Sequence, residues 1–131
     1  MTWWGRYVGV PYGGEEGEET CWTLVRRVLF EQRGVSLPDY GEIRADDLAA
    51  VARGLRDGAE ADQWRAVDVP CAFDVVLMRH PQHARVGHVG VMVSGYAVLH
   101  VERASASAVV PIDHFAISSR ILGFRRHEAL A

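Results

Sequence analysis

The segment TCWTLVRRVLFEQRG, residues 20–34, decides the first half of the fold, because its apolar residues recur with helical spacing. The buried stripe is predicted to consist of Leu24, Val25, Val28 and Leu29. Thr20 is a suitable N-cap and Gly34 a suitable residue after the last turn, so we predict a helix over residues 21–33. Thr23 is not the acidic or amide residue that completes a capping box.

Beyond this helix, the pattern changes once along the chain. A second helix is predicted over residues 44–56, and from Phe73 onward short runs rich in Val, Ile, Leu and Phe predict strands. The expected strands are residues 73–78, 86–93, 97–103, 108–110 and 120–126. Helices followed by strands with short turns predict an α+β domain, with N-terminal helices packed on a mostly antiparallel sheet of about five strands.

The composition sets limits on size and partners. A chain of 131 residues, 49% hydrophobic and 24% charged, is predicted to be a single domain spanning residues 1–131. A net charge of −3 argues against a nucleic acid partner, and no apolar run is long enough to predict membrane insertion. Two cysteines form no disulfide framework and no metal-ligand spacing, so we predict no metal and no cofactor.

A chemical site is predicted from one cysteine and two histidines. Cys21 opens the first helix, His88 lies in the strand GHVGVMV (residues 87–93), and His100 lies on the next strand. A thiol, an imidazole base and a group that orients the base form a nucleophilic site. The helix N-terminus and a nearby imidazolium are expected to lower the thiol pKa, whereas the glutamates in residues 15–19 oppose a thiolate.

The two histidines share a face only in one hairpin register. In an antiparallel pair, opposed residues have a constant index sum. A two-residue turn at Ser94-Gly95 puts His100 on the other face from His88, whereas an odd loop, Ser94-Gly95-Tyr96, puts His88, Gly90 and His100 on one face. The catalytic interpretation therefore predicts the odd loop or a bulge.

These motifs resemble the NlpC/p-sixty family of papain-like cell-wall cysteine peptidases. The matching segments are Tyr12-Gly13-Gly14, Cys21-Trp22-x-Leu24-Val25, Asp74-Val75-Val76-Leu77 and His88-Val89-Gly90-Val91. The resemblance implies a papain-like fold and hydrolysis of peptidoglycan stem peptides, typically at the γ-D-glutamyl–diaminopimelate bond.

Carried over residue by residue, the resemblance implies specific roles. Cys21 becomes the nucleophile, His88 the base and His100 the orienting group, with Tyr12 and Trp22 expected at the substrate. The sequence departs from the family pattern where Thr20 replaces Asp, Thr23 replaces Gly, and Phe73 replaces the Gly before Asp74.

The Cys-Trp-x-Leu-Val form and the Trp-rich start resemble the subclass found in phage tails and gene-transfer-agent particles. The resemblance therefore implies phage-like tail or baseplate proteins as partners. Residues 1–6 lack the basic flank and apolar core of a signal peptide. We therefore expect synthesis in the bacterial cytoplasm and release on a tail.

Other interpretations remain open at this stage. A cysteine at the start of an apolar helix also fits simple packing. The chain could be a structural tail-tip adaptor with a vestigial peptidase site, or an amidase or acyl transferase on the same scaffold. Cys71 follows Pro70 at a strand entrance and is expected to be structural.

Overall fold

The computed structural model describes residues 2–37, 64–79, 86–102 and 105–130. In the described residues, one α-helix, α1 (Cys21–Arg33), packs on a six-stranded antiparallel sheet. The strands are β1 (Trp64–Val67), β2 (Val75–Arg79), β3 (Val86–Met92), β4 (Ala97–His100), β5 (Ala108–Pro111) and β6 (Ile121–His127). Short 3-10 helices are η1 (Gly5–Tyr7), η4 (Ser118–Arg120) and η5 (Glu128–Leu130).

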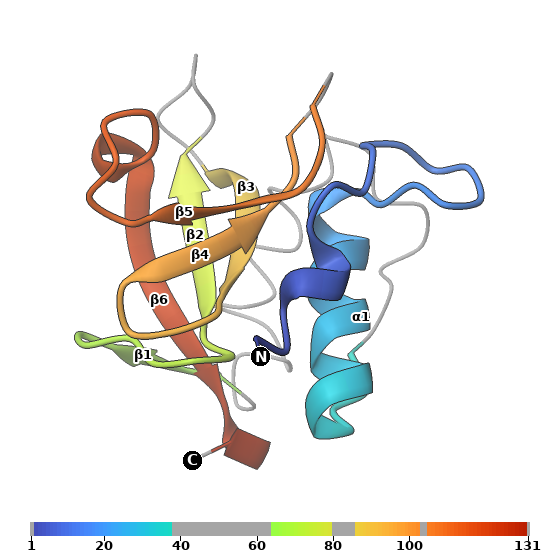
Figure 1. Ribbon diagram of the computed structural model, residues 1–131. Helices are drawn as coiled ribbons and strands as arrows, with labels where there is room; N and C mark the ends of the chain where they lie inside the picture. Colours follow the sequence, from blue (N-terminus) through green and yellow to red (C-terminus); the bar gives the residue numbers. More distant parts are fainter. Residues whose placement is uncertain (1, 38–63, 80–85, 103–104, 131) are drawn as a thin grey trace.

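The sheet has the order β1-β6-β2-β3-β4-β5, so its central strands come from the middle and the end of the chain. Figure 1 shows α1 standing beside the sheet, while β4 and β5 run across β2 and β6. The predicted α+β class is confirmed. The predicted helix over residues 44–56 lies outside the described residues.

The helix has the predicted bounds and the predicted C-terminus. Gly34 adopts the left-handed conformation, with φ 68°, and ends α1. Our prediction for the N-terminus is wrong in one respect, because Thr23 does complete a capping box. The Thr20 N–H donates to Thr23 Oγ1 at 2.8 Å and the Thr23 N–H donates to Thr20 Oγ1 at 3.2 Å, so a hydroxyl replaces the usual carboxylate.

The two faces of the sheet bury different apolar sets, because successive strand residues point to opposite sides. The face toward α1 includes Val75, Leu77, Val89, Val91 and Leu99, which cluster with Leu24, Val25, Val28 and Leu29. The other face includes Val76, Met78, Met92 and Val98, which cluster with Ile117. In the described residues, no helix has both the length and the apolar character needed to cross a bilayer.

The N-terminal arm joins α1 to the segment before β5. Tyr7 is fully buried, its hydroxyl donates to Glu31 Oε1 at 2.8 Å, and Gln32 donates to the same hydroxyl at 3.0 Å. Gly9 N–H donates to the Ser107 carbonyl at 2.8 Å. The arm is therefore fixed on both sides before the chain reaches Cys21.

Phe73 occupies a backbone conformation that favours glycine. Its φ is 74°, in the left-handed region. Its ring stacks on Trp3 with centroids 4.7 Å apart, and the Arg33 guanidinium lies 5.3 Å from the ring centre. Aromatic and cation–π contacts therefore hold the Phe73 side chain at the position where the NlpC/p-sixty pattern has a glycine.

The left-handed backbone at Phe73 predicts that two substitutions at this position differ in stability. Phe73→Gly and Phe73→Ala both remove the stack on Trp3, but only alanine keeps a Cβ in the left-handed region. We expect the glycine variant to be more stable than the alanine variant by about 1 kcal/mol, measured by urea unfolding. An alanine variant that is equally or more stable would contradict the strain at Phe73.

Candidate functional site

Cys21 begins α1, and its sulfur is buried against β3. The side chain is 5% exposed and belongs to the main core cluster. A hydrogen bond from the Val89 backbone reaches the sulfur, as do backbone groups at the helix start. The thiol therefore lies beside β3, one residue along the strand from His88.

Burial, rather than the helix terminus, dominates the ionisation of Cys21. Burial raises the pKa of the Cys21 thiol to about 11, while the hydrogen bonds from Val89, Trp22 and Cys21 backbone groups lower it by less. The negative charge of Glu102 also raises this pKa. The expectation of a lowered thiol pKa is therefore wrong, because loss of solvation outweighs the helix N-terminus.

The hairpin between β3 and β4 has the register that the histidine pair needs. Val91 pairs with Leu99 and Met92 with Val98, so the index sum is 190. Val93 N–H donates to the Ala97 carbonyl at 2.9 Å, and this bond closes the three-residue loop. The predicted odd loop is confirmed, and His88 and His100 lie on one face.

The two imidazoles form a direct hydrogen bond. His88 Nε2 lies 2.8 Å from His100 Nδ1, and the ring centroids are 5.1 Å apart. Burial, with smaller contributions from His100 and Arg120, lowers the pKa of His88 to about 3. Burial also lowers the pKa of His100, so both rings are neutral near pH 7 and share one hydrogen.

Gly90 allows this close approach. A Cβ at Gly90 would lie 2.6 Å from Val98 Cγ2, 3.0 Å from the Leu99 carbonyl oxygen and 3.2 Å from His100 Cβ. A side chain at this position would therefore displace β4 and the histidine that it carries.

The structure adds two charged residues that the sequence analysis missed. Glu102 Oε1 lies 3.6 Å from His88 Nε2 and 4.0 Å from His100 Nδ1, and Arg120 Nη1 lies 2.6 Å from the same oxygen. The index sum of 190, continued past the end of β4, assigns Glu102 to His88, so this residue could have been found from the sum. Arg120 has no comparable signal, because η4 reaches the site through the long-range pairing of β6 with β2.

The same side chains supply atoms that a metal ion could use. His88, His100 and Glu102 each offer one ligand atom, and these three atoms lie within 4.8 Å of one another. Arg120 already places its guanidinium on the Glu102 carboxylate, so an incoming cation would meet a positive charge. The arrangement fits a hydrogen-bonded relay better than a metal site.

The two predicted substrate-binding residues have different surroundings. Tyr12 is half-buried, packs against the main core and pairs with Glu19 in an isolated bridge just before α1. Trp22 is 1% exposed and belongs to the core. The role of Trp22 at the substrate stays a prediction, and the burial of its side chain shows that it also serves the core.

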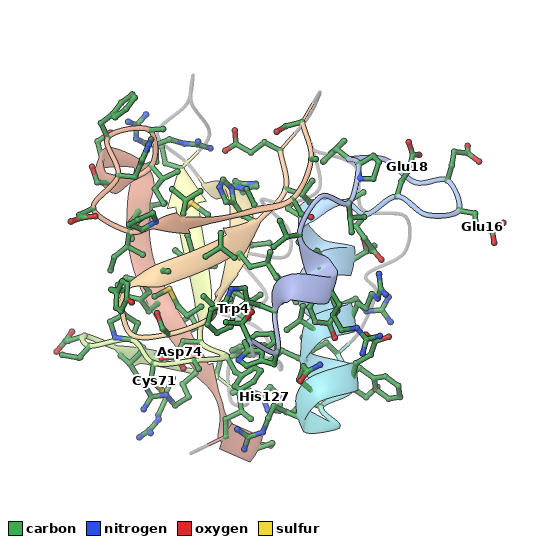
Figure 2. The ribbon with its side chains drawn as sticks, viewed as in Figure 1. Trp4, Glu16, Glu18, Cys71, Asp74 and His127 are labelled. Atoms are coloured by element: carbon green, nitrogen blue, oxygen red, sulfur yellow. The ribbon has the colours of Figure 1, made fainter. Side chains whose placement is uncertain are left out.

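Cys71 and the glutamates of the loop before α1 lie away from the histidine pair. Cys71 is exposed before β2, near Asp74, whereas His88 pairs with Met78 at the opposite end of that strand (Figure 2). Figure 2 also shows Glu16 and Glu18 on a loop that projects away from the sheet. Glu19 lies 3.5 Å from Arg27, so its charge is paired.

Comparisons with known proteins support the fold. No family model matches the sequence, and no curated protein matches it. A lipoprotein-like NLP/P60 family protein from Staphylococcus aureus subsp. aureus Mu50 superposes with a TM-score of 0.62 and 20% identity, over 93% of this chain and 38% of that chain. An NlpC/P60 family protein from Bacillus cereus ATCC 10987 has a TM-score of 0.63 and 17% identity, over 95% and 37%.

The NlpC/p60 domain of the peptidoglycan hydrolase SagA gives a TM-score of 0.55 and 19% identity, over 92% of this chain and 88% of that domain. The present chain thus spans less than half of the first two proteins and nearly the whole of this domain. The fold is NlpC/P60-like: one N-terminal helix packed on a six-stranded antiparallel sheet.

The role of Gly90 is testable by adding one methyl group. We expect Gly90→Ala to destabilise the protein by about 1–3 kcal/mol, because the new Cβ overlaps β4. Chemical unfolding measures the loss. Gly14→Ala is the matched control, since a Cβ there would meet no atom within 4 Å. Equal stability of the two variants would contradict the close packing at Gly90.

The lowered pKa of His88 predicts an acid sensitivity of stability. The unfolded chain protonates this histidine near pH 6.5, whereas the folded protein does so only near pH 3. The stability contributed by the neutral ring is therefore complete above pH 6.5 and is lost as the pH falls toward 3.

Between pH 6.5 and pH 5, the free energy of unfolding should fall by roughly 2 kcal/mol less in His88→Gln than in the wild-type protein. Urea unfolding at both pH values measures it, with His114→Gln as a control outside the site. An unchanged pH dependence in His88→Gln would contradict the neutral buried ring.

Proposed function

We propose that the protein is a peptidoglycan hydrolase that acts as a cysteine peptidase. Cys21 is the nucleophile, His88 the general base and His100 the group that orients His88. The observations that carry the proposal are the 2.8 Å bond between His88 Nε2 and His100 Nδ1 and the hydrogen bond from the Val89 backbone, next to His88 in the sequence, to the Cys21 thiol. The NlpC/P60-like fold, shared with a peptidoglycan hydrolase domain, supports the substrate class.

The geometry suggests how the proton moves. His88 Nε2 is engaged by His100, so Nδ1 is the ring nitrogen that accepts the Cys21 proton. Both groups are neutral before substrate binds, so the proton leaves the thiol as the sulfur attacks the carbonyl carbon. His88 thus acts as a general base during attack.

The remaining steps follow from the same groups. The sulfur–carbon bond forms as the carbonyl π electrons move to oxygen, and in this proposal the Cys21 backbone N–H stabilises that oxyanion. His88 then protonates the leaving amine as the carbon–nitrogen bond breaks. Water, deprotonated by His88, hydrolyses the thioester and returns the thiol.

The specific bond and setting extend this proposal. We propose the γ-D-glutamyl–diaminopimelate bond of the stem peptide as the target. We also propose that the protein is made in the bacterial cytoplasm and carried on a phage-like tail, where it contacts tail or baseplate proteins. The support for this setting is the Cys21-Trp22-x-Leu24-Val25 pattern and the Trp-rich start of the sequence. Trp3 packs on Phe73, so it serves the fold of the arm whatever the setting.

A second candidate is a structural tail component whose peptidase site is vestigial or slow. The observation that favours it is the protonated state of Cys21, since a thiol with a pKa of about 11 is a weak nucleophile until a base acts on it. The two candidates share the fold and differ only in turnover.

Digestion of purified sacculi decides between them. The wild-type protein should release soluble muropeptides, and Cys21→Ala should lower the rate by at least about a thousandfold. Cys71→Ala is the matched control and should keep full activity, since Cys71 lies outside the site. Mass spectrometry of the new termini distinguishes a peptidase from an amidase or acyl transferase. Equal release by the wild-type protein and Cys21→Ala would overturn the nucleophile assignment.

A further inference from the structure

Behind the histidine pair lies an ion pair that the proposed catalytic steps do not use. Arg120 Nη1 donates to Glu102 Oε1 at 2.6 Å, and its Nε donates to the Arg79 carbonyl at 3.0 Å. The Arg120 side chain is 10% exposed and that of Glu102 is 36% exposed. A mostly buried guanidinium needs such partners, and its two bonds fix the carboxylate relative to β2.

The carboxylate oxygen lies close to the shared hydrogen of the histidine pair. Oε1 is 3.6 Å from His88 Nε2 and 4.0 Å from His100 Nδ1, so it is nearer to the His88 nitrogen. A negative charge there favours the hydrogen on His88 Nε2, which then donates to His100 Nδ1. In that tautomer His88 Nδ1 carries a lone pair, as a general base requires.

We propose that Glu102, held in place by Arg120, is a positioning residue that selects the Nε2–H tautomer of His88 and stabilises the imidazolium formed when His88 takes the Cys21 proton. The inference rests on the proposed function. No proton moves to or from Glu102 in this role. The thiol proton goes to His88 Nδ1.

In the described residues, several neighbouring elements contribute charged or titratable groups around His88 and His100. Cys21 comes from α1, Glu102 from the segment after β4 and Arg120 from η4, while β2 places apolar Met78 opposite His88. Arg120 lowers the pKa of both histidines, whereas Glu102 raises that of His100. Removing one charge or the other should therefore affect the histidines in opposite directions.

The experiment uses two single variants and their combination in the full chain. Glu102→Gln removes the carboxylate charge and keeps its size, and Arg120→Gln removes the guanidinium charge and keeps a donor. Glu16→Gln, on the projecting loop, is the matched control. Histidine ¹⁵N chemical shifts report the tautomer at pH 7 and the imidazole pKa on acidification, without requiring activity.

The expected results differ for each variant. Glu102→Gln should shift His88 away from the Nε2–H tautomer and lower kcat on sacculi by about 10- to 100-fold with little change in KM. Arg120→Gln should raise the pKa of the histidine pair by at least about 1 unit and move the acid limb of the activity profile upward. The double variant should return the histidine pKa toward the wild-type value.

An unchanged His88 tautomer in Glu102→Gln would overturn the inference, as would histidine shifts of the same sign in both single variants. If Arg120→Gln does not fold, the tautomer in Glu102→Gln decides alone. Failure of the proposed function is separable: it shows as no difference between the wild-type protein and Cys21→Ala on sacculi, whereas the ¹⁵N shifts judge the role of Glu102 by themselves.

Discussion

The site depends on the register of one hairpin. The loop of three residues between Val93 and Ala97 fixes which residues of β3 and β4 oppose one another. Because side chains alternate along a strand, a slip of one residue would move His100 to the opposite face and leave His88 alone. The bond between the imidazoles, the contact at Gly90 and the position of Glu102 all follow from the index sum of 190.

A second constraint comes from packing α1 directly on β3. This packing brings the Cys21 sulfur against the backbone of Val89, but it also removes the thiol from water. The result is a site whose thiol and base are both neutral, with charge held behind them in Glu102 and Arg120. Under the proposed mechanism, such a site ionises only when a substrate carbonyl is present to receive the sulfur.

Local and periodic features were predictable from the sequence, whereas long-range partners were not. The bounds of α1 and its Gly34 terminus follow from helical spacing and glycine chemistry. The odd hairpin loop was predicted only because the catalytic interpretation needs both histidines on one face, and the strand pairing confirms it. Strand β1 was missed because its four residues, Trp64–Val67, show no alternation of polar and apolar side chains and are too few to be distinguished from a loop. Arg120 and the raised thiol pKa both depend on which surfaces meet in three dimensions, and single-sequence patterns carry no such information.

The contrast between the two cysteines affects how chemical modification of this protein should be interpreted. Cys71 is exposed at one end of β2, and Cys21 is enclosed at α1. An electrophilic reagent or an oxidant will therefore meet Cys71 first, so labelling or disulfide-linked dimers report on a surface thiol. The same asymmetry makes Cys71 a selective attachment point for a fluorophore, a spin label or a solid support that leaves Cys21 unmodified.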